Sequence, residues 1–266
     1  MDLPTDWTTD SLQTNGVELQ YYRTGDGPPV VMAHGFGENG RCFEPLASAL
    51  ADEYEVITYD ARAHGHSGAP ESGYDIEDRV ADLVGLVESL DLDDPILLGH
   101  SMGGSTVAWT AATHPELPRA VVLEDPAAMY GESEMSPGER AEIVREQLAE
   151  DAEKTVEERA DEYQEFTPEQ ARRHAVADDE CRTAIAEIAR EGYPQAPDAF
   201  PDIECPALVL LGDREVERRV AAYDAAEALE QGRLVHVPGA GHYVFETRFD
   251  AAFAELQTFL RRLPER

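Results

Sequence analysis

The stretch Gly99-His100-Ser101-Met102-Gly103-Gly104 follows directly on the apolar run Pro95-Ile96-Leu97-Leu98 and carries the strongest fold signal in the chain. A serine on a sharp strand-to-helix turn is forced toward positive φ, and its neighbours two positions away come so close that only very small side chains fit. Gly99 and Gly103 meet this steric demand, and the turn holds the Ser101 hydroxyl in the open. The pattern predicts a buried strand, a tight elbow with a serine nucleophile, and a helix.

Apolar runs and helix signals alternate on both sides of this elbow. Short continuous apolar runs are typical of strands that are buried on both faces. The strand candidates are residues 29–33, 55–59, 95–98, 119–123, 206–211 and 234–237, and a hairpin is expected where residues 11–14 and 17–23 flank Asn15-Gly16. The helix candidates are residues 43–50, 75–90 and 249–263. The alternation predicts an α/β fold with a mostly parallel, eight-stranded twisted sheet and helices on both faces, and ligands bind outside the carboxyl ends of such strands.

This order of motifs resembles the α/β-hydrolase superfamily, in its small capped esterase, haloperoxidase and iminopeptidase-like branches. The resemblance rests on the hairpin, the loop His34-Gly35-Phe36-Gly37, the loop 60–67 and the elbow 99–103. It implies an oxyanion hole made by the backbone N–H groups of Phe36 and Met102. One departure is Ala63, where many relatives carry glycine, and it bears on the shape of that loop.

A serine hydroxyl is a poor nucleophile unless an imidazole lies within hydrogen-bond reach and a carboxylate orients that imidazole. His242 is the predicted base, because relatives carry theirs on a similar glycine-flanked loop and the order serine, acid, histidine fits the fold. Relatives usually place the acid three residues after the glycine that ends the seventh strand, and that residue is Glu215 here. Asp213 in the same loop and Asp125 after the sixth strand are the alternatives.

The other histidines are expected to be structural. His34 and His100 are predicted to pair with backbone near their loops. Asp60, His64 and His66 superficially suggest a metal site, but they lie in a tight loop of small residues without a second ligand cluster. We therefore expect no metal ion and no cofactor.

The middle segment reads differently from its flanks and predicts a small helical cap. Three hydroxyl residues, Ser136, Thr155 and Thr167, are each followed three positions later by Glu or Gln, which is the capping-box pattern of a helix start. A fourth helix is expected over residues 180–190, ended by Gly192. The predicted division is an α/β-hydrolase core of residues 1–126 and 203–266 with a helical cap insertion of residues 127–202.

A cap of this kind would exclude water from the site and shape its specificity. The candidate substrate-binding side chains are Met129, Tyr130 and Tyr163, with Phe166 and Tyr193 as further wall residues. The alternative is a solvated helical insertion without substrate contact.

Composition bounds the setting of the protein. The 266 residues, 42% of them hydrophobic, suffice for one large core plus the cap. Neither a membrane span nor an amino-terminal signal stretch is visible, so a cytoplasmic location is expected. The three cysteines are scattered and are expected to be reduced thiols.

The charge is extreme: 55 acidic residues against 21 basic ones give a formal net charge of -34. The acidic residues are spread along the chain, and Lys154 is the only lysine. Such a chain repels itself in dilute buffer, whereas molar salt shortens the Debye length to about 3 Å. We interpret the charge as a halophilic adaptation, and it makes nucleic acid and membrane surfaces unsuitable partners.

These features predict a serine hydrolase that cleaves a small carboxylic ester, or a related small-molecule acyl substrate, through an acyl-enzyme. Ser101 argues against dehalogenase or epoxide hydrolase chemistry, because those relatives carry aspartate at the elbow. The same site would also serve carbon-carbon bond hydrolysis, perhydrolysis or iminopeptidase activity, and fold alone does not choose among them. A non-catalytic ligand-binding or sensor protein is the alternative of another class. The sequence leaves the oligomeric state open.

Overall fold

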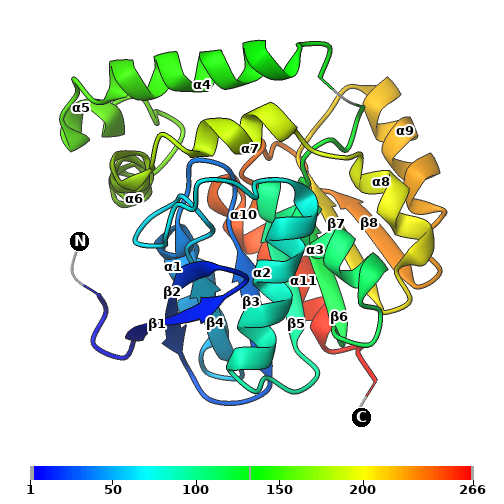
Figure 1. Ribbon diagram of the computed structural model, residues 1–266. Helices are drawn as coiled ribbons and strands as arrows, with labels where there is room; N and C mark the ends of the chain where they lie inside the picture. The colour runs from blue at the N-terminus through cyan, green and yellow to red at the C-terminus, as the bar shows by residue number, and fades with distance from the viewer. Residues whose placement is uncertain (1–2, 132, 265–266) are drawn as a thin grey trace.

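An eight-stranded sheet runs through the computed structural model, which describes residues 3–131 and 133–264 (Figure 1). In spatial order the strands are β1 (Thr8–Thr14), β2 (Val17–Thr24), β4 (Glu55–Tyr59), β3 (Pro29–Ala33), β5 (Ile96–His100), β6 (Ala120–Glu124), β7 (Ala207–Leu211) and β8 (Gly232–His236). From β4 to β8 all neighbouring strands pair in parallel. The predicted α/β class and mostly parallel sheet are confirmed.

The antiparallel edge is the predicted hairpin. Strands β1 and β2 pair from Thr14 opposite Val17 outward, and Asn15 and Gly16 turn the chain with φ values of 42° and 73°. Positive φ at both positions is the type I′ geometry that suits a two-residue hairpin. Because β2 also pairs antiparallel with β4, the hairpin extends the parallel sheet at one edge.

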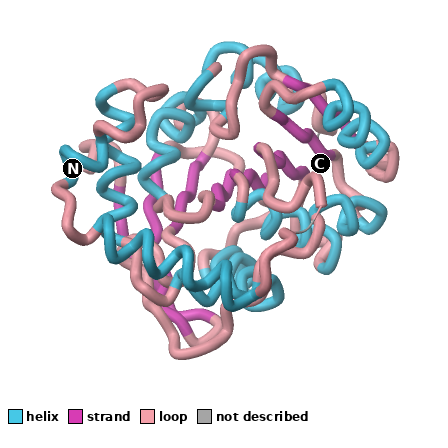
Figure 2. The backbone as a smooth tube through the Cα atoms, turned by 90° about the horizontal axis from the view of Figure 1, so that it is seen from above, coloured by secondary structure: helices cyan, strands magenta, loops and turns pink. Residues whose placement is uncertain are grey.

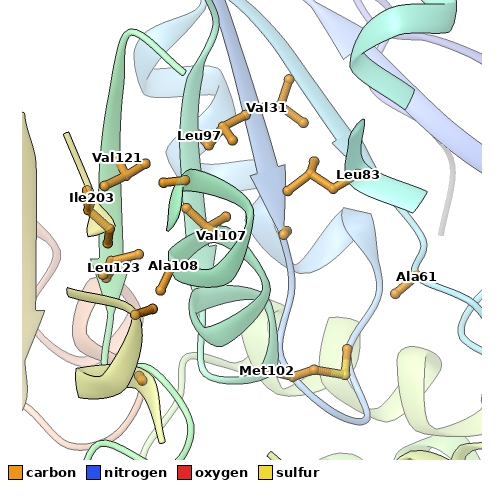
Figure 3. Close-up of a cluster of buried hydrophobic side chains, with 14 of the residues drawn as sticks. Val31, Ala61, Leu83, Leu97, Met102, Val107, Ala108, Val121, Leu123 and Ile203 are labelled. Carbon is orange, nitrogen blue, oxygen red and sulfur yellow. The ribbon is translucent and has the colours of Figure 1, made fainter. Parts of the chain in front are cut away.

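The parallel strands from β4 to β7 are buried on both faces, and their successive residues serve opposite faces. In β3, Val31 belongs to one hydrophobic cluster, whereas Val30 and Met32 belong to the other. Figure 3 shows part of the first cluster, where Leu97 and Val121 of the sheet face Val107 of the helix behind the elbow. This explains why the strands read as continuous apolar runs instead of alternating ones.

Helices cover both faces of the sheet, and Figure 2 shows them on either side of the strands. On one face lie α2 (Ile76–Ser89), α3 (Met102–Thr113) and α8 (Ala196–Ala199), and α1 (Glu44–Leu50) and α11 (Phe249–Leu260) lie on the other. Four more helical elements are associated with the sheet: η1 (Gly40–Phe43), η2 (Phe200–Asp202), α9 (Val216–Ala226) and α10 (Val244–Thr247). None of the helices in the described part of the chain is long and apolar enough to cross a membrane.

Four further helices between β6 and β7, here called the inserted helices, lie across one end of the sheet (Figure 1). They are α4 (Pro137–Asp151), α5 (Val156–Ala160), α6 (Pro168–Glu180) and α7 (Ile185–Glu191). All three predicted capping boxes are present, at Ser136, Thr155 and Thr167. In each, the cap hydroxyl accepts a backbone N–H while the Glu or Gln carboxyl or amide oxygen accepts the N–H of the cap residue.

The helix predicted over residues 180–190 is present as α7, but it begins five residues later than predicted. Helix α6 continues to Glu180, Cys181 is extended, and α7 begins only at Ile185. The backbone N–H of Arg182 donates to the carbonyl of Ala63 at 2.9 Å, so a contact with the core replaces an intrahelical bond at the break. Gly192 ends α7 as predicted, with a φ of 76°.

Candidate active site

The elbow has the predicted geometry. Ser101 lies between β5 and α3 with φ 49° and ψ -110°, a combination that L-residues adopt only under strain. A Cβ atom on Gly99 would collide with the Gly103 backbone, and one on Gly103 would collide with the Ala33 carbonyl. The glycines therefore let β5, β3 and the start of α3 approach closely enough to hold the serine at the carboxyl end of the sheet.

The imidazole of His242 is paired with a buried carboxylate. Its Nδ1 lies 2.7 Å from Oδ2 of Asp125, whose side chain is only 3% exposed. Asp125 follows β6 directly, with a φ of 38° that Asp tolerates better than most residues, and His242 follows β8. Since β5 and β6 are neighbours, the ends of these strands bring residues 101 and 125 to the same edge of the sheet. Among the described residues, no hydrogen bond joins the Ser101 hydroxyl to His242.

The carboxylate beside His242 is thus that of Asp125, one of the two alternatives, and not that of Glu215, the residue at the usual position of the acid. Glu215 is an exposed residue at the start of α9, and its carboxylate forms no hydrogen bond or ion pair with His242. Asp213 is also exposed, and it accepts the Gly239 N–H at 3.2 Å and faces Arg219. The loop after β7 therefore supplies no carboxylate to His242.

That loop supplies a cation instead. A guanidinium nitrogen of Arg214 donates to the same Asp125 oxygen that faces His242 Nδ1. The Asp125 carboxylate is held from two sides, by an imidazole and by a guanidinium. Sequence reasoning missed Arg214 because it looked for an acid in this loop.

The backbone N–H groups of Phe36 and Met102, the predicted oxyanion donors, are unpaired among the described residues. Neither the Phe36 N–H nor the Met102 N–H donates a hydrogen bond to another residue in the described ranges. Their neighbours are fixed: Gly35 N–H donates to Glu38, and Gly37 N–H donates to His64 Nε2 at 3.2 Å. Two unpaired N–H groups beside a serine elbow are the arrangement that stabilises a developing oxyanion.

Buried neutral histidines hold the loops around these donors. The Nε2 atom of His34 accepts the Ala61 N–H at 2.9 Å. The backbone carbonyl of His34 accepts the Gly103 N–H at 3.0 Å. Burial lowers the pKa of His34, and it lowers the pKa of His64 to about 3. Ala63 adopts a φ of 65° in the neighbouring loop, so the position where many relatives carry glycine does require a left-handed backbone.

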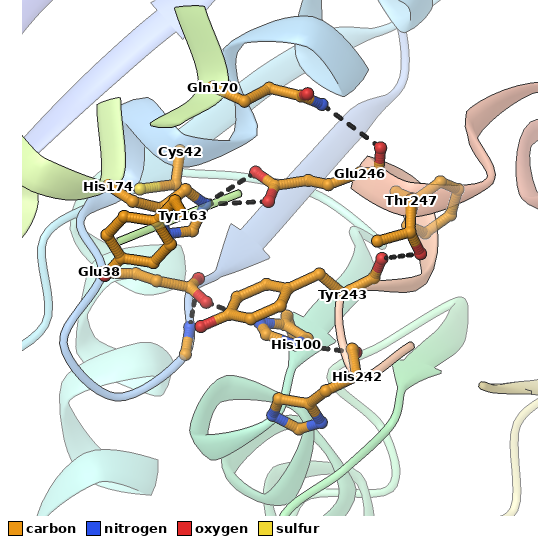
Figure 4. A network of polar contacts seen from close by, with 12 residues as sticks. Glu38, Cys42, His100, Tyr163, Gln170, His174, His242, Tyr243, Glu246 and Thr247 are labelled. Carbon is orange, nitrogen blue, oxygen red and sulfur yellow. Dashed lines mark hydrogen bonds and ion pairs between the residues drawn. The ribbon is translucent and has the colours of Figure 1, made fainter. Parts of the chain in front are cut away.

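A buried ion pair connects the loop after β3 with the elbow and with His242 (Figure 4). Glu38 Oε1 lies 2.8 Å from His100 Nδ1, and both side chains are almost fully buried. Burial opposes the charge on His100, but the carboxylates of Glu38 and Glu124 raise its pKa to about 10. The protonated His100 donates its other N–H to the carbonyl of His242 at 3.2 Å. The ion pair therefore positions the backbone on which the imidazole sits.

A second ion pair joins the inserted helices to the segment behind His242. His174 of α6 lies 2.8 Å from a carboxylate oxygen of Glu246 in α10 (Figure 4). Burial opposes the charge on His174, and its hydrogen bond to Glu246 raises the pKa above the ordinary value. Gln170 of α6 also donates to the Glu246 carbonyl at 3.4 Å.

A cavity of about 780 Å³ opens beside Ser101. Phe36 and Ile76 line it from the sheet side, and Ile143 and Val144 of α4 line it from the inserted helices. Tyr193, just after α7, is a further lining residue.

The three side chains predicted to bind substrate do not line this cavity. Met129 is buried in the hydrophobic core. The Tyr130 ring lies under the guanidinium of Arg218, and the Tyr163 hydroxyl donates to Asp178. Met129 and Tyr130 were predicted as apolar and aromatic side chains of the middle segment, and residue type alone does not distinguish a cavity wall from the core. In residues 3–131 and 133–264, no group of three or more His, Cys, Asp or Glu side chains is placed to hold a metal ion.

The sheet order, the serine elbow and the loops at its carboxyl edge define the class: this is a hydrolase built on the α/β-hydrolase fold. Residues 30–256 match the sequence profile of the alpha/beta hydrolase family, and the chain belongs to that family.

Relatives of known name are hydrolases and haloperoxidases. The chain is 30% identical over 277 residues to the 2-(acetamidomethylene)succinate hydrolase of Mesorhizobium japonicum, an alignment that covers 98% of this chain and 99% of that protein. It is 41% identical over 101 residues to a non-heme chloroperoxidase of Kitasatospora aureofaciens, covering 38% and 37% of the two chains. Among solved structures, the enol-lactonase of Burkholderia xenovorans is 26% identical with a TM-score of 0.76, covering 95% of this chain and 100% of that one.

Proposed function

We propose that this protein is a serine hydrolase that cleaves a small carboxylic ester through an acyl-enzyme, with Ser101, His242 and Asp125 as its catalytic triad. The observation that carries the proposal is the buried Asp125 carboxylate 2.7 Å from His242 Nδ1, at the same sheet edge as a strained serine elbow. Membership of a family whose relatives are named hydrolases supports the reaction class.

The reaction proceeds in two acyl-transfer steps. His242 takes the proton of the Ser101 hydroxyl as the serine oxygen adds to the substrate carbonyl, and the N–H groups of Phe36 and Met102 hold the oxyanion. When the tetrahedral intermediate collapses, His242 returns the proton to the leaving alcohol and an ester to Ser101 remains. Water then repeats the sequence and releases the acid. Catalytic hydrogen bonds of this kind often tighten only when substrate binds, and the proposal requires one between Ser101 and His242 in that complex.

The inserted helices act as a cap in this scheme. Their residues Arg140, Ile143 and Val144 line the cavity beside Ser101, so they exclude water and shape the acyl site. One relative that matches over nearly its full length is named for a substrate with an acylated nitrogen, and the same triad would cleave such a bond. An ester and the corresponding amide should therefore be compared in one assay.

Fluorophosphonate labelling tests the proposal. We expect a single adduct on Ser101, detected by intact mass and peptide mapping, and loss of both labelling and ester turnover in Ser101→Ala. Ser133 also lines the cavity, so Ser133→Ala is the matched control and should label at the wild-type rate. An unlabelled wild-type protein, or an adduct that persists in Ser101→Ala, would contradict the assignment and favour a ligand-binding role.

We infer, in addition, that the protein is adapted to molar salt. The support is a formal net charge of -34 on 266 residues. At about 1 M salt the Debye length is roughly 3 Å, so self-repulsion between surface carboxylates is largely removed. Melting temperature and kcat/KM should both rise from dilute buffer toward molar potassium chloride. Full activity in dilute buffer, without a melting shift on adding salt, would refute this inference.

A further inference from the structure

The charge of the cavity beside Ser101 is as informative as its shape. Its walls near the serine are apolar, with Phe36 and Ile76 from the core and Ile143 and Val144 from α4. Such walls favour a hydrocarbon acyl chain, because burying apolar surface is the main source of affinity in pockets of this kind.

Carboxylates predominate among the charged lining residues. Asp75, Glu77 and Glu191 all line the cavity with exposed side chains, and none of them forms an ion pair with a described residue. Asp75 is fixed in place because its carboxylate caps α2 and accepts the Asp78 N–H at 3.0 Å. An anionic group on a substrate would meet like charges here, and it would approach a protein with a net charge of -34.

Among the described lining residues Arg140 is the cation, and it is already engaged. The guanidinium of Arg140 donates to three backbone carbonyls, those of Met135 at 2.7 Å, Ala189 at 2.7 Å and Arg190 at 2.6 Å. These bonds hold the start of α4 against the end of α7. Arg140 therefore serves the packing of the inserted helices and does not stand ready for a carboxylate.

A second cation lies behind the cavity wall. The guanidinium of Arg79 is buried, lies 5.0 Å from the centre of the Tyr193 ring, and has no hydrogen-bond partner among the described residues. Tyr193 lines the cavity, whereas Arg79 does not. Arg79 is thus a buried cation next to the Tyr193 ring, outside the set of residues that line the cavity.

From this distribution we infer that the substrate is an uncharged ester with an apolar acyl chain, and that the site discriminates against acyl chains that end in a carboxylate. The inference rests on the proposed function, since it concerns the acyl group delivered to Ser101. It separates this chain from the relative named as a succinate hydrolase, despite 30% identity along the whole length.

Methyl butyrate and monomethyl succinate test the inference, because they differ by a terminal methyl group against a terminal carboxylate. In molar potassium chloride, where long-range repulsion is screened, kcat/KM should favour methyl butyrate by at least about tenfold. The double variant Glu77→Gln/Glu191→Gln should lower the ratio of the two kcat/KM values several-fold, because its kcat/KM for monomethyl succinate rises. Glu88→Gln/Glu116→Gln removes the same charge from positions that do not line the cavity and should leave the ratio unchanged.

The opposite results are distinguishable. Equal or faster turnover of monomethyl succinate, with Ser101 labelled as proposed, would overturn the inference and leave the hydrolase intact. If Arg79→Met abolished that turnover, the buried guanidinium would be the carboxylate site. Failure to hydrolyse either ester, together with absence of a Ser101 adduct, would instead overturn the proposed function.

Discussion

Asp125→Asn should lower kcat for ester hydrolysis by roughly 10⁴-fold while the protein stays folded. The carboxylate accepts the His242 Nδ1 proton and so keeps Nε2 free to take the proton of Ser101. An amide in the same place presents N–H to Nδ1 and imposes the wrong tautomer, which leaves Nε2 protonated and unable to act as a base. The rate of fluorophosphonate labelling should fall with kcat, because it depends on the same activated serine.

Glu215→Gln and Asp213→Asn are the matched controls. Each removes one negative charge from the neighbouring loop, and neither side chain contacts His242. Both variants should retain wild-type kcat within about twofold, as surface substitutions away from a site usually do. The opposite pattern, with Asp125→Asn active and Glu215→Gln inactive, would return the acid to the loop after β7.

Much of the core could be predicted from sequence because its signals are local. The hairpin at Asn15-Gly16 and the capping boxes at Ser136, Thr155 and Thr167 depend on contacts within a few residues, and all are present. The elbow is local as well, since the required glycines stand two positions from Ser101. Helix boundaries that depend on distant contacts were harder to predict. The break after Glu180 is an example, because the Arg182 N–H there donates to the carbonyl of Ala63.

The identity of the carboxylate could not be settled from sequence because it depends on how distant loops meet. Asp125 and His242 are 117 residues apart, and the order of strands in the sheet decides which loop faces the imidazole. The available signal was an aspartate directly after a buried strand that neighbours β5. The prediction favoured Glu215 over this aspartate because relatives usually carry the acid at that position. In this chain Glu215 instead stands at the start of α9.

Of the predicted wall residues, Tyr193 lines the cavity, whereas Met129, Tyr130, Tyr163 and Phe166 do not. Tyr163 lies at helical spacing in the inserted segment, but its hydroxyl is bonded to Asp178 and its ring stacks on Phe166. Ile143 of α4, which is not among the predicted wall residues, lines the cavity instead. Which face of an inserted helix meets the core depends on the loops that connect it, and periodicity alone carries no such information.

The buried pair of Glu38 and His100 should be the most sensitive stability element near the site. Glu38→Ala removes the partner of a protonated imidazole and of the Gly35 N–H at once. Breaking a buried ion pair from one side typically costs about 3–5 kcal/mol. Chemical denaturation should show a loss of this size, whereas Glu88→Ala on the exposed face of α2 should change the free energy of unfolding by less than about 0.5 kcal/mol.

The pH dependence of the stability loss in Glu38→Ala tests whether the ion pair with His100 causes that loss. His100 has a pKa raised to about 10, so its contribution to stability is complete below the ordinary histidine pKa of about 6.5 and is lost as the pH rises through about 10. Glu124 and Glu246 also act on His100, His34 and His174 act on Glu38, and the carbonyl of His242 accepts the other His100 N–H. The gap in unfolding free energy between wild type and Glu38→Ala should therefore be wide near pH 6 and narrow toward pH 10. A gap that stays constant over this range would mean that Glu38 acts by packing and by its bond to Gly35 alone. Because His100 also holds the carbonyl of His242, the variant should label more slowly at Ser101 even where it remains folded.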